Sequence, residues 1–220
     1  MRVVLASKSP RRETLLKQIG VQFTCNPADV EENVDNPDGD PASICTELAA
    51  AKARAVAAME PEALIIAADT IVVVDRQILG KPRDKAEAFH MLSMLSGREH
   101  QVITGLCVLN TSNGCIQTRS EITRVRFRNI QEEEIWAYID SGEPLDKAGA
   151  YGVQGLGAVF VEHIEGCFYN VVGLPLHTLY MMLQEQGLQL LGGSKDELSG
   201  GRHKGFARGY ASPGKTGQTW

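Results

Sequence analysis

The chain has 220 residues, 43% of them hydrophobic and 22% charged, and a net charge of -5, which is ordinary for a globular protein of one domain or two lobes. The negative balance argues against a broad nucleic-acid surface, although a local positive cluster can still bind a small anion. The five cysteines show no CxxC spacing, which argues against disulfides or a zinc site and predicts a cytoplasmic protein. We expect neither a signal peptide nor a membrane span, because no apolar run approaches ~20 residues.

The chain opens on a short strand followed by a helix. Residues 2–6 (RVVLA) are apolar after Arg2 and predict a short buried strand. Ser9 suits the N-cap of the helix, Pro10 its first position and Gly20 the residue after its end.

Two arginines, Arg11 and Arg12, fall in the first turn of this helix. The positive end of the helix dipole disfavours cations there, and a bound anion would reverse that balance. The hydroxyls of Ser7 and Ser9, together with Lys8, add further anion-binding groups. We therefore expect these arginines to hold a phosphate rather than to stabilise the fold. The alternative is a pair of surface arginines beside an ordinary helix start.

Strand and helix patterns then alternate along the chain. Strands are predicted at residues 21–24, 63–74, 100–109, 117–127, 157–164 and 169–172, and helices from Pro41 onward and at 84–95, 131–139 and 174–186. The polar residues 26–40 predict a loop. Because two hairpin-like strands lie in the middle, we expect an α/β fold with a mixed sheet rather than a doubly wound one.

The composition changes after Leu191. Residues 192–220 are rich in Gly and Ser and contain five Lys or Arg against two acids. This segment lacks the apolar content to pack, so it predicts a disordered basic tail. We therefore divide the chain into a domain of residues 1–191 and a tail of residues 192–220.

Asp69 interrupts the most hydrophobic stretch of the chain, residues 64–73. A carboxylate in a core strand is costly unless it is paired, binds metal or faces a cleft. We favour a functional role over a loop-capping aspartate, because Asp69 stands at the middle of the strand. Glu32 lies in the polar loop and, with Asp69, offers the oxygen ligands that Mg²⁺ or Mn²⁺ prefers.

Three further positions carry weaker signals. Lys52 follows the apolar positions Ile44 and Leu48 on its helix, so its ammonium reaches either solvent or a cleft. Lys81 follows Gly80, but Pro82 excludes a P-loop, and a surface turn is the plain interpretation. Residues 143–157 are dense in glycine, which lets backbone approach a ligand closely, and Gln154 among them could bind the edge of a base.

Together these residues resemble the Maf family of nucleoside triphosphate pyrophosphatases, which is related to septum-formation inhibitors. The resemblance runs from Val3 to about Leu183. Its motifs are residues 6–12 (ASKSPRR), 68–72 (ADTIV), 80–82 (GKP), 95–97 (LSG), 143–152 (EPLDKAGAYG) and 170–175 (NVVGLP).

The resemblance implies an elongated mixed β-sheet flanked by helices, with two lobes and a deep cleft, and often a homodimer. It implies hydrolysis of a nucleoside triphosphate to the monophosphate and pyrophosphate with a divalent metal, Mg²⁺, Mn²⁺ or Co²⁺. The catalytic carboxylate would be Asp69, which with Glu32 would also bind the metal. The remaining cleft residues would be Ser7, Arg11, Arg12, Lys52, Thr70, Lys81 and Gln154.

The residues Arg11, Thr70 and Gln154 match the branch of the family that acts on dTTP and UTP. Two alternatives stay open. One is a purine-directed house-cleaning pyrophosphatase, which a base-preference assay distinguishes. The other is a non-enzymatic nucleotide-binding regulator of septum formation, which would not need Asp69 or the metal carboxylates.

Overall fold

The computed structural model describes residues 1–28, 30 and 39–191. Residues Met1–Leu190 form one compact unit. Glu32 and the expected tail at 192–220 lie outside the described residues. In the described part of the chain, no helix is both long and apolar enough to span a bilayer.

The described residues form a seven-stranded sheet with the order β2-β1-β3-β5-β6-β7, and β4 pairs with β3. The strands are β1 (Arg2–Leu5), β2 (Thr24–Cys25), β3 (Ala63–Val74), β4 (Gln77–Leu79), β5 (Glu99–Asn110), β6 (Cys115–Phe127) and β7 (Val161–Glu165). β1 pairs in parallel with β2 and β3, whereas the other pairs are antiparallel. The predicted mixed sheet is confirmed.

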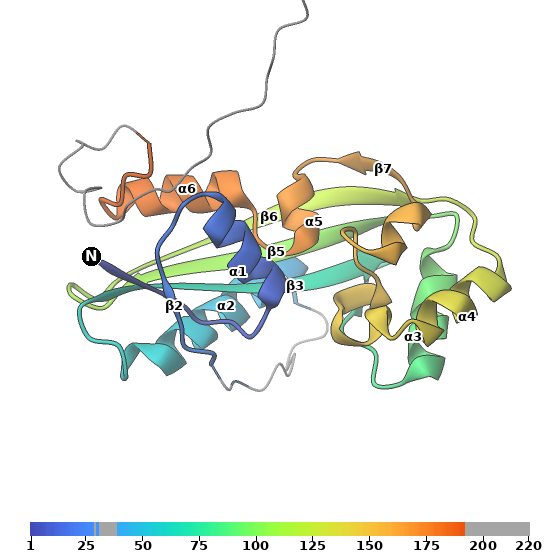
Figure 1. The fold of residues 1–220 in the computed structure, drawn as a ribbon, viewed down its shortest axis with the longest axis horizontal. Helices are drawn as coiled ribbons and strands as arrows, with labels where there is room; N and C mark the ends of the chain where they lie inside the picture. Colours follow the sequence, from blue (N-terminus) through green and yellow to red (C-terminus); the bar gives the residue numbers. More distant parts are fainter. Residues whose placement is uncertain (29, 31–38, 192–220) are drawn as a thin grey trace, which may run out of the picture. The chain divides into compact units, whose positions relative to one another are not determined.

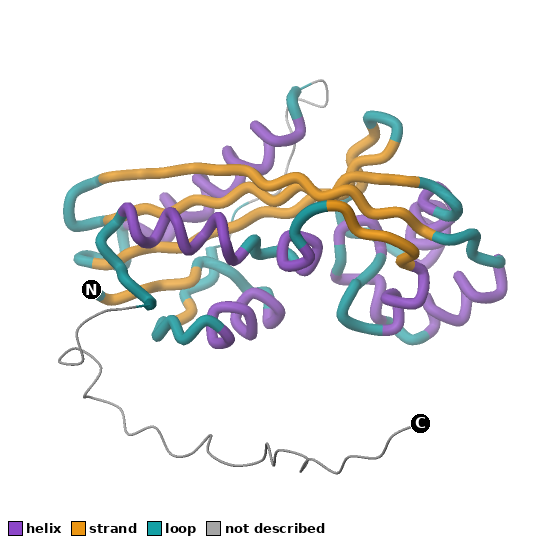
Figure 2. Tube along the Cα trace, turned by 90° about the horizontal axis from the view of Figure 1, so that it is seen from above, coloured by secondary structure: helices purple, strands orange, loops and turns teal. Residues whose placement is uncertain are grey.

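Helices cover the sheet on both faces (Figures 1 and 2). They are α1 (Pro10–Gln18), α2 (Pro41–Ala57), α3 (Lys85–Leu95), α4 (Glu132–Asp140), α5 (Phe168–Val172) and α6 (Leu176–Glu185), with 3-10 turns η1 (Glu143–Asp146), η2 (Ala148–Ala150) and η3 (Leu156–Phe160). Leu64 and Ile66 of β3 pack with α1 and α6, whereas Ile65 and Ala67 pack with α2. This two-sided burial explains why β3 is a continuous apolar run.

The first helix begins and ends where its residues predict. Ser9 occupies the N-cap, although its side chain makes no capping hydrogen bond. At the other end Gly20 takes φ +76°, its N–H donates to Lys17 at 3.0 Å, and that of Val21 donates to Leu16 at 3.2 Å. This pair of bonds is a Schellman ending, which favours glycine at the left-handed position.

Four expectations from the sequence need correction. Residues 169–172 belong to helix α5, and residues 157–160 to η3, so only the end of the expected strand 157–164 is extended. The strand expected at 21–24 is reduced to Thr24–Cys25. Helix α2 is buried mainly through small residues, and Leu48 is only half-buried. Short apolar segments carry no clear period, so tertiary packing decides their structure.

Candidate active site

A cavity of about 1230 Å³ lies between α1 and α2 on one side and α3, η1 and η2 on the other. It corresponds to the cleft that the resemblance implies. It is lined by every predicted site residue that the structure describes: Ser7, Arg11, Arg12, Lys52, Asp69, Thr70, Lys81 and Gln154. Residues that are far apart in the sequence therefore meet around one cavity.

Asp69 and Lys52 form a buried ion pair at the cavity floor. Their exposed fractions are 7% and 8%, and Lys52 Nζ lies 2.5 Å from Asp69 Oδ1. The pair forms because α2 packs closely on β5, where Gly105 stands opposite Asp69. A Cβ at Gly105 would lie 2.2 Å from the Cys45 backbone. Lys52 therefore points inward at the carboxylate, rather than emerging at the edge of its helix.

Arg12 joins three segments of the chain beneath the cavity. Its guanidinium donates to the Gly173 carbonyl at 2.8 Å, to Thr70 Oγ1 at 3.0 Å and to Ser7 Oγ at 3.3 Å. These bonds connect α1 to β3 and to the end of α5. Arg12 therefore also connects parts of the fold, while its expected contact with a ligand stays a prediction.

Thr70 lines the cavity and also belongs to a chain of hydrogen-bonded polar side chains. Besides accepting from Arg12, its hydroxyl lies 2.9 Å from that of Thr104. Thr104 donates to the Asn170 carbonyl at 3.4 Å, and the Asn170 amide donates to Thr123 at 3.0 Å. Buried networks of this kind fix side-chain orientation, although Asn170 Oδ1 has no hydrogen-bond partner among the described residues. Sequence patterns missed Thr104 and Thr123, whose only signal is a hydroxyl at a buried strand position.

Arg11 has a more exposed position at the cavity edge. It forms an ion pair of 3.1 Å with Asp146 of η1, whose side chain is 63% exposed. Lys147 also binds Asp146, at 2.6 Å. Partial burial acts to raise the pKa of Asp146, but the bond from Lys147 and the charge of Arg11 outweigh it and hold that pKa below its usual value. A surface pair of this kind contributes little to stability.

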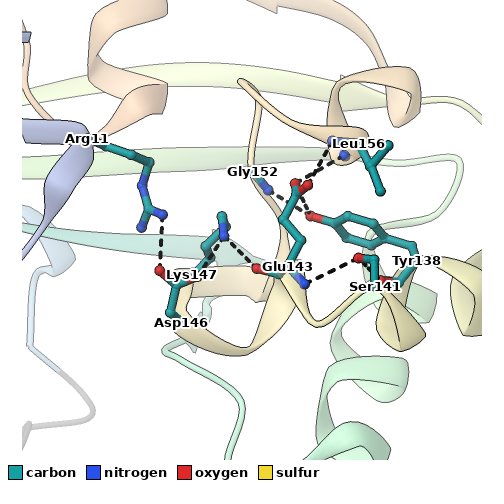
Figure 3. Close-up of polar contacts among 9 residues, drawn as sticks. Arg11, Tyr138, Ser141, Glu143, Asp146, Lys147, Gly152 and Leu156 are labelled. Atoms are coloured by element: carbon teal, nitrogen blue, oxygen red, sulfur yellow. Dashed lines mark hydrogen bonds and ion pairs between the residues drawn. The ribbon is translucent and has the colours of Figure 1, made fainter. Parts of the chain in front are cut away.

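The glycine-rich segment 152–157 closes around Glu143 (Figure 3), and Gly152 and Gly155 of this segment also line the cavity. Gln154, in the middle of this segment, is exposed and lines the cavity. Lys81 is exposed on the same cavity, directly after Gly80, whose carbonyl accepts from Gly149 N–H at 3.0 Å. The turn at Lys81 is therefore part of the site.

Two more residues, one at the cavity and one its buried hydrogen-bond partner, were not singled out from the sequence. Tyr151 lines it, and its hydroxyl lies 2.8 Å from His100 Nε2. Burial lowers the pKa of His100 to about 4, so the ring is neutral at neutral pH. Tyr151 lies in the motif at residues 143–152. Nothing in the local sequence indicates that it pairs with His100 of β5, which is 51 positions away.

A metal-binding set is not complete among these residues. Within residues 1–28, 30 and 39–191, no three His, Cys, Asp or Glu side chains form a group that could bind a metal ion. Asp69 is directed at Lys52, and Glu32 lies outside the described residues.

Comparison with known proteins gives close relatives. A dTTP/UTP pyrophosphatase of Ruminiclostridium cellulolyticum is 50% identical over 183 residues, which cover 83% of this chain and 95% of the relative. A dTTP/UTP pyrophosphatase of Carboxydothermus hydrogenoformans is 50% identical over 187 residues, covering 85% of this chain and 100% of the relative.

More distantly, a solved nucleoside-triphosphatase, a dITP/XTP pyrophosphatase of Mycobacterium abscessus, aligns over 85% of this chain and 96% of its own with 10% identity and a TM-score of 0.40. At that level the alignment supports no conclusion about the site. The Maf-like protein family model matches residues 2–186, and the chain belongs to this family.

Proposed function

We propose that this protein hydrolyses dTTP and UTP, and modified pyrimidine nucleoside triphosphates, to the monophosphate and pyrophosphate. The observation that carries the reaction class is the placement of Asp69, a buried carboxylate at the floor of a cavity lined by cations. The names of relatives that are 50% identical support the choice of base.

The reaction requires a water molecule activated next to the α-phosphorus. Asp69 accepts a proton from this water as its oxygen attacks phosphorus, and the bond from phosphorus to the α,β-bridging oxygen breaks. Pyrophosphate leaves with the bond's electron pair. Lys52, 2.5 Å from Asp69, holds the carboxylate in place. Arg11 and Lys81 reduce the repulsion between phosphate charges from the cavity edge.

Selection of the base is assigned to Gln154, with Arg11 and Thr70. The Gln154 amide can donate to O4 and accept from N3–H, the pattern that uracil and thymine share. Cytosine reverses this pattern, so CTP would leave polar groups mismatched. Each mismatch costs roughly 1–3 kcal/mol, which is about 10- to 100-fold in efficiency.

A divalent metal, Mg²⁺, Mn²⁺ or Co²⁺, is part of the proposal, with Glu32 and Asp69 as its ligands. When bound, it would neutralise charge on the phosphate oxygens. Loss of turnover in EDTA, with recovery on adding one of the three ions, tests the metal.

We also place the protein in the cytoplasm, because of its cysteine pattern, and we expect it to assemble as a homodimer. Light scattering tests the dimer.

The decisive experiment measures kcat/KM for UTP, dTTP, CTP, GTP and 7-methyl-GTP and separates the products by chromatography. We expect UTP and dTTP to be the best substrates, yielding monophosphate and pyrophosphate. Higher efficiency on a guanine nucleotide would favour the purine-directed enzyme. Nucleotide binding without turnover under any metal would favour the non-enzymatic regulator.

A further inference from the structure

The Glu143 carboxylate lies inside the segment that carries Gln154. It accepts hydrogen bonds from the backbone N–H of Leu156 at 2.9 Å and of Gly157 at 3.4 Å. It also accepts one from the Tyr138 hydroxyl at 2.9 Å. Figure 3 shows these donors converging on one side chain. The C-terminal end of the segment is therefore attached to Glu143.

The N-terminal end of the segment is attached through Tyr138. The hydroxyl that donates to Glu143 accepts from Gly152 N–H at 3.1 Å. Gly152 and Leu156 thus bond to the same carboxylate–phenol pair, with Gln154 midway between them. Two anchors this close together leave the backbone of Gln154 little freedom to move.

The glycines of this segment allow the backbone to approach Glu143 and Tyr138 closely. A Cβ at Gly155 would lie 2.3 Å from a Glu143 oxygen, and one at Gly157 would lie 2.8 Å from the Tyr138 hydroxyl. Neither glycine has a positive φ. Close approach of the backbone to Glu143 and Tyr138, rather than an unusual conformation, explains the glycine density.

The carboxylate itself is held in position and ionised. Ser141 Oγ accepts from the Glu143 N–H at 3.2 Å, and Lys147 donates to the Glu143 carbonyl. Burial acts to raise the pKa of Glu143, but the Leu156, Tyr138 and Gly157 bonds and the Lys147 charge together hold it below its usual value. An ionised carboxylate accepts at both oxygens, which an amide cannot do.

We propose that Glu143 is a positioning residue for base selection, which holds the 152–157 segment so that Gln154 meets the O4 and N3–H of a uracil or thymine ring. This role rests on the proposed pyrimidine preference. The proposal assigns Glu143 no contact with phosphate or water. Substitution of Glu143 should therefore change which base is accepted more than the rate at which the phosphorus–oxygen bond breaks.

The test compares Glu143→Gln with the wild type for kcat and KM on UTP and CTP. The amide places an NH₂ where one oxygen accepts hydrogen bonds, so one anchor of the segment is lost. We expect the UTP:CTP ratio of kcat/KM to fall about tenfold, mainly through a higher KM for UTP, while kcat for UTP stays within about threefold.

Glu121→Gln is the matched control. Glu121 is also half-buried and accepts a hydroxyl hydrogen bond, from Thr178 at 2.6 Å, but it does not line the cavity. This variant should keep the wild-type ratio. Tyr138→Phe removes the acceptor of Gly152 N–H and should lower the ratio in the same direction, and it replaces Glu143→Gln if that variant does not fold.

The outcomes separate the two proposals. Equal wild-type efficiencies on UTP and CTP would overturn the pyrimidine preference and the selecting role together. A wild type that discriminates, with variants that keep its ratio, would overturn the role of Glu143 alone. An equal loss of kcat on both substrates would mean that Glu143 acts in the chemistry or only in stability, and would also reject the proposal.

Discussion

The floor and one wall of the cavity are built in different ways. The floor, defined by Asp69, Lys52 and Arg12, rests on β3, α2 and α1, and both members of its ion pair are less than 10% exposed. The wall, defined by η1 and residues 152–157, is irregular backbone organised by Glu143. Regular elements thus position Asp69, the proposed general base, and one side chain holds the segment that carries Gln154, the proposed selecting residue. Changes to the floor should affect stability and turnover, and changes to the wall should affect selectivity.

The largest effect is expected for Asp69→Asn. Loss of the general base should lower kcat by at least ~10²-fold. The same change removes the carboxylate that lies 2.5 Å from the buried Lys52 ammonium, and breaking a buried pair costs about 3–5 kcal/mol of unfolding free energy. UTP turnover and urea unfolding measure the two effects.

The control for Asp69→Asn is the double variant Lys52→Met with Asp69→Asn. It removes both charges, so most of the stability should return while activity stays low. Near-normal turnover in a folded Asp69→Asn variant would reject the general base. Failure of the double variant to regain stability would show that the ion pair is not the cause of the loss.

The neighbouring arginines provide the second contrast. Arg12→Ala removes hydrogen bonds to Ser7, Thr70 and Gly173 and should lower the free energy of unfolding by about 1.5–3 kcal/mol, the scale for losing hydrogen bonds from a charged group. Arg11→Ala removes one exposed ion pair to Asp146 and should change stability by less than about 1 kcal/mol. Thermal unfolding without nucleotide compares the stability of the two variants. Equal losses of stability would contradict the distinction between a structural Arg12 and an exposed Arg11.

Two glycines give a third contrast, between floor and wall. Gly105→Ala would place a Cβ 2.2 Å from the Cys45 backbone, whereas Gly155→Ala would meet the end of the Glu143 side chain. Backbone of α2 cannot move cheaply, so Gly105→Ala should cost about 1–3 kcal/mol of unfolding free energy.

Gly155→Ala should leave stability within about 0.5 kcal/mol, because Glu143 can swing aside. The UTP:CTP ratio should nevertheless fall, since Glu143 then loses its bonds to the segment. A large loss of stability in Gly155→Ala, or none in Gly105→Ala, would contradict the expected difference between the floor and the wall.

The sequence predicted the floor better than the wall, for a physical reason. β3 is a long apolar run, so the charge of Asp69 stood out against it. Lys52 could be placed on its helix, but its partner depended on the close packing of α2 on β5 at Gly105. Local periodicity does not report such tertiary contacts.

The wall lacked a periodic pattern altogether. Its glycines predicted close backbone approach, and the backbone does approach Glu143 closely; approach to a ligand stays a prediction. The helix α5 was predicted as a strand because its five residues are too few to reveal a helical period. Whether Gln154 selects the base stays a prediction.

The smallest effect is expected from removing residues 192–220. Every described residue of the floor and the wall precedes Leu190, within one compact unit, and the family match ends at residue 186. The removed segment is rich in Gly and Ser and lacks the apolar residues needed to pack against a core. A chain that ends at Leu191 should therefore keep the wild-type melting temperature, kcat and UTP:CTP ratio. A lower melting temperature would show that the segment packs on the domain, whereas a changed ratio alone would show that it reaches the wall.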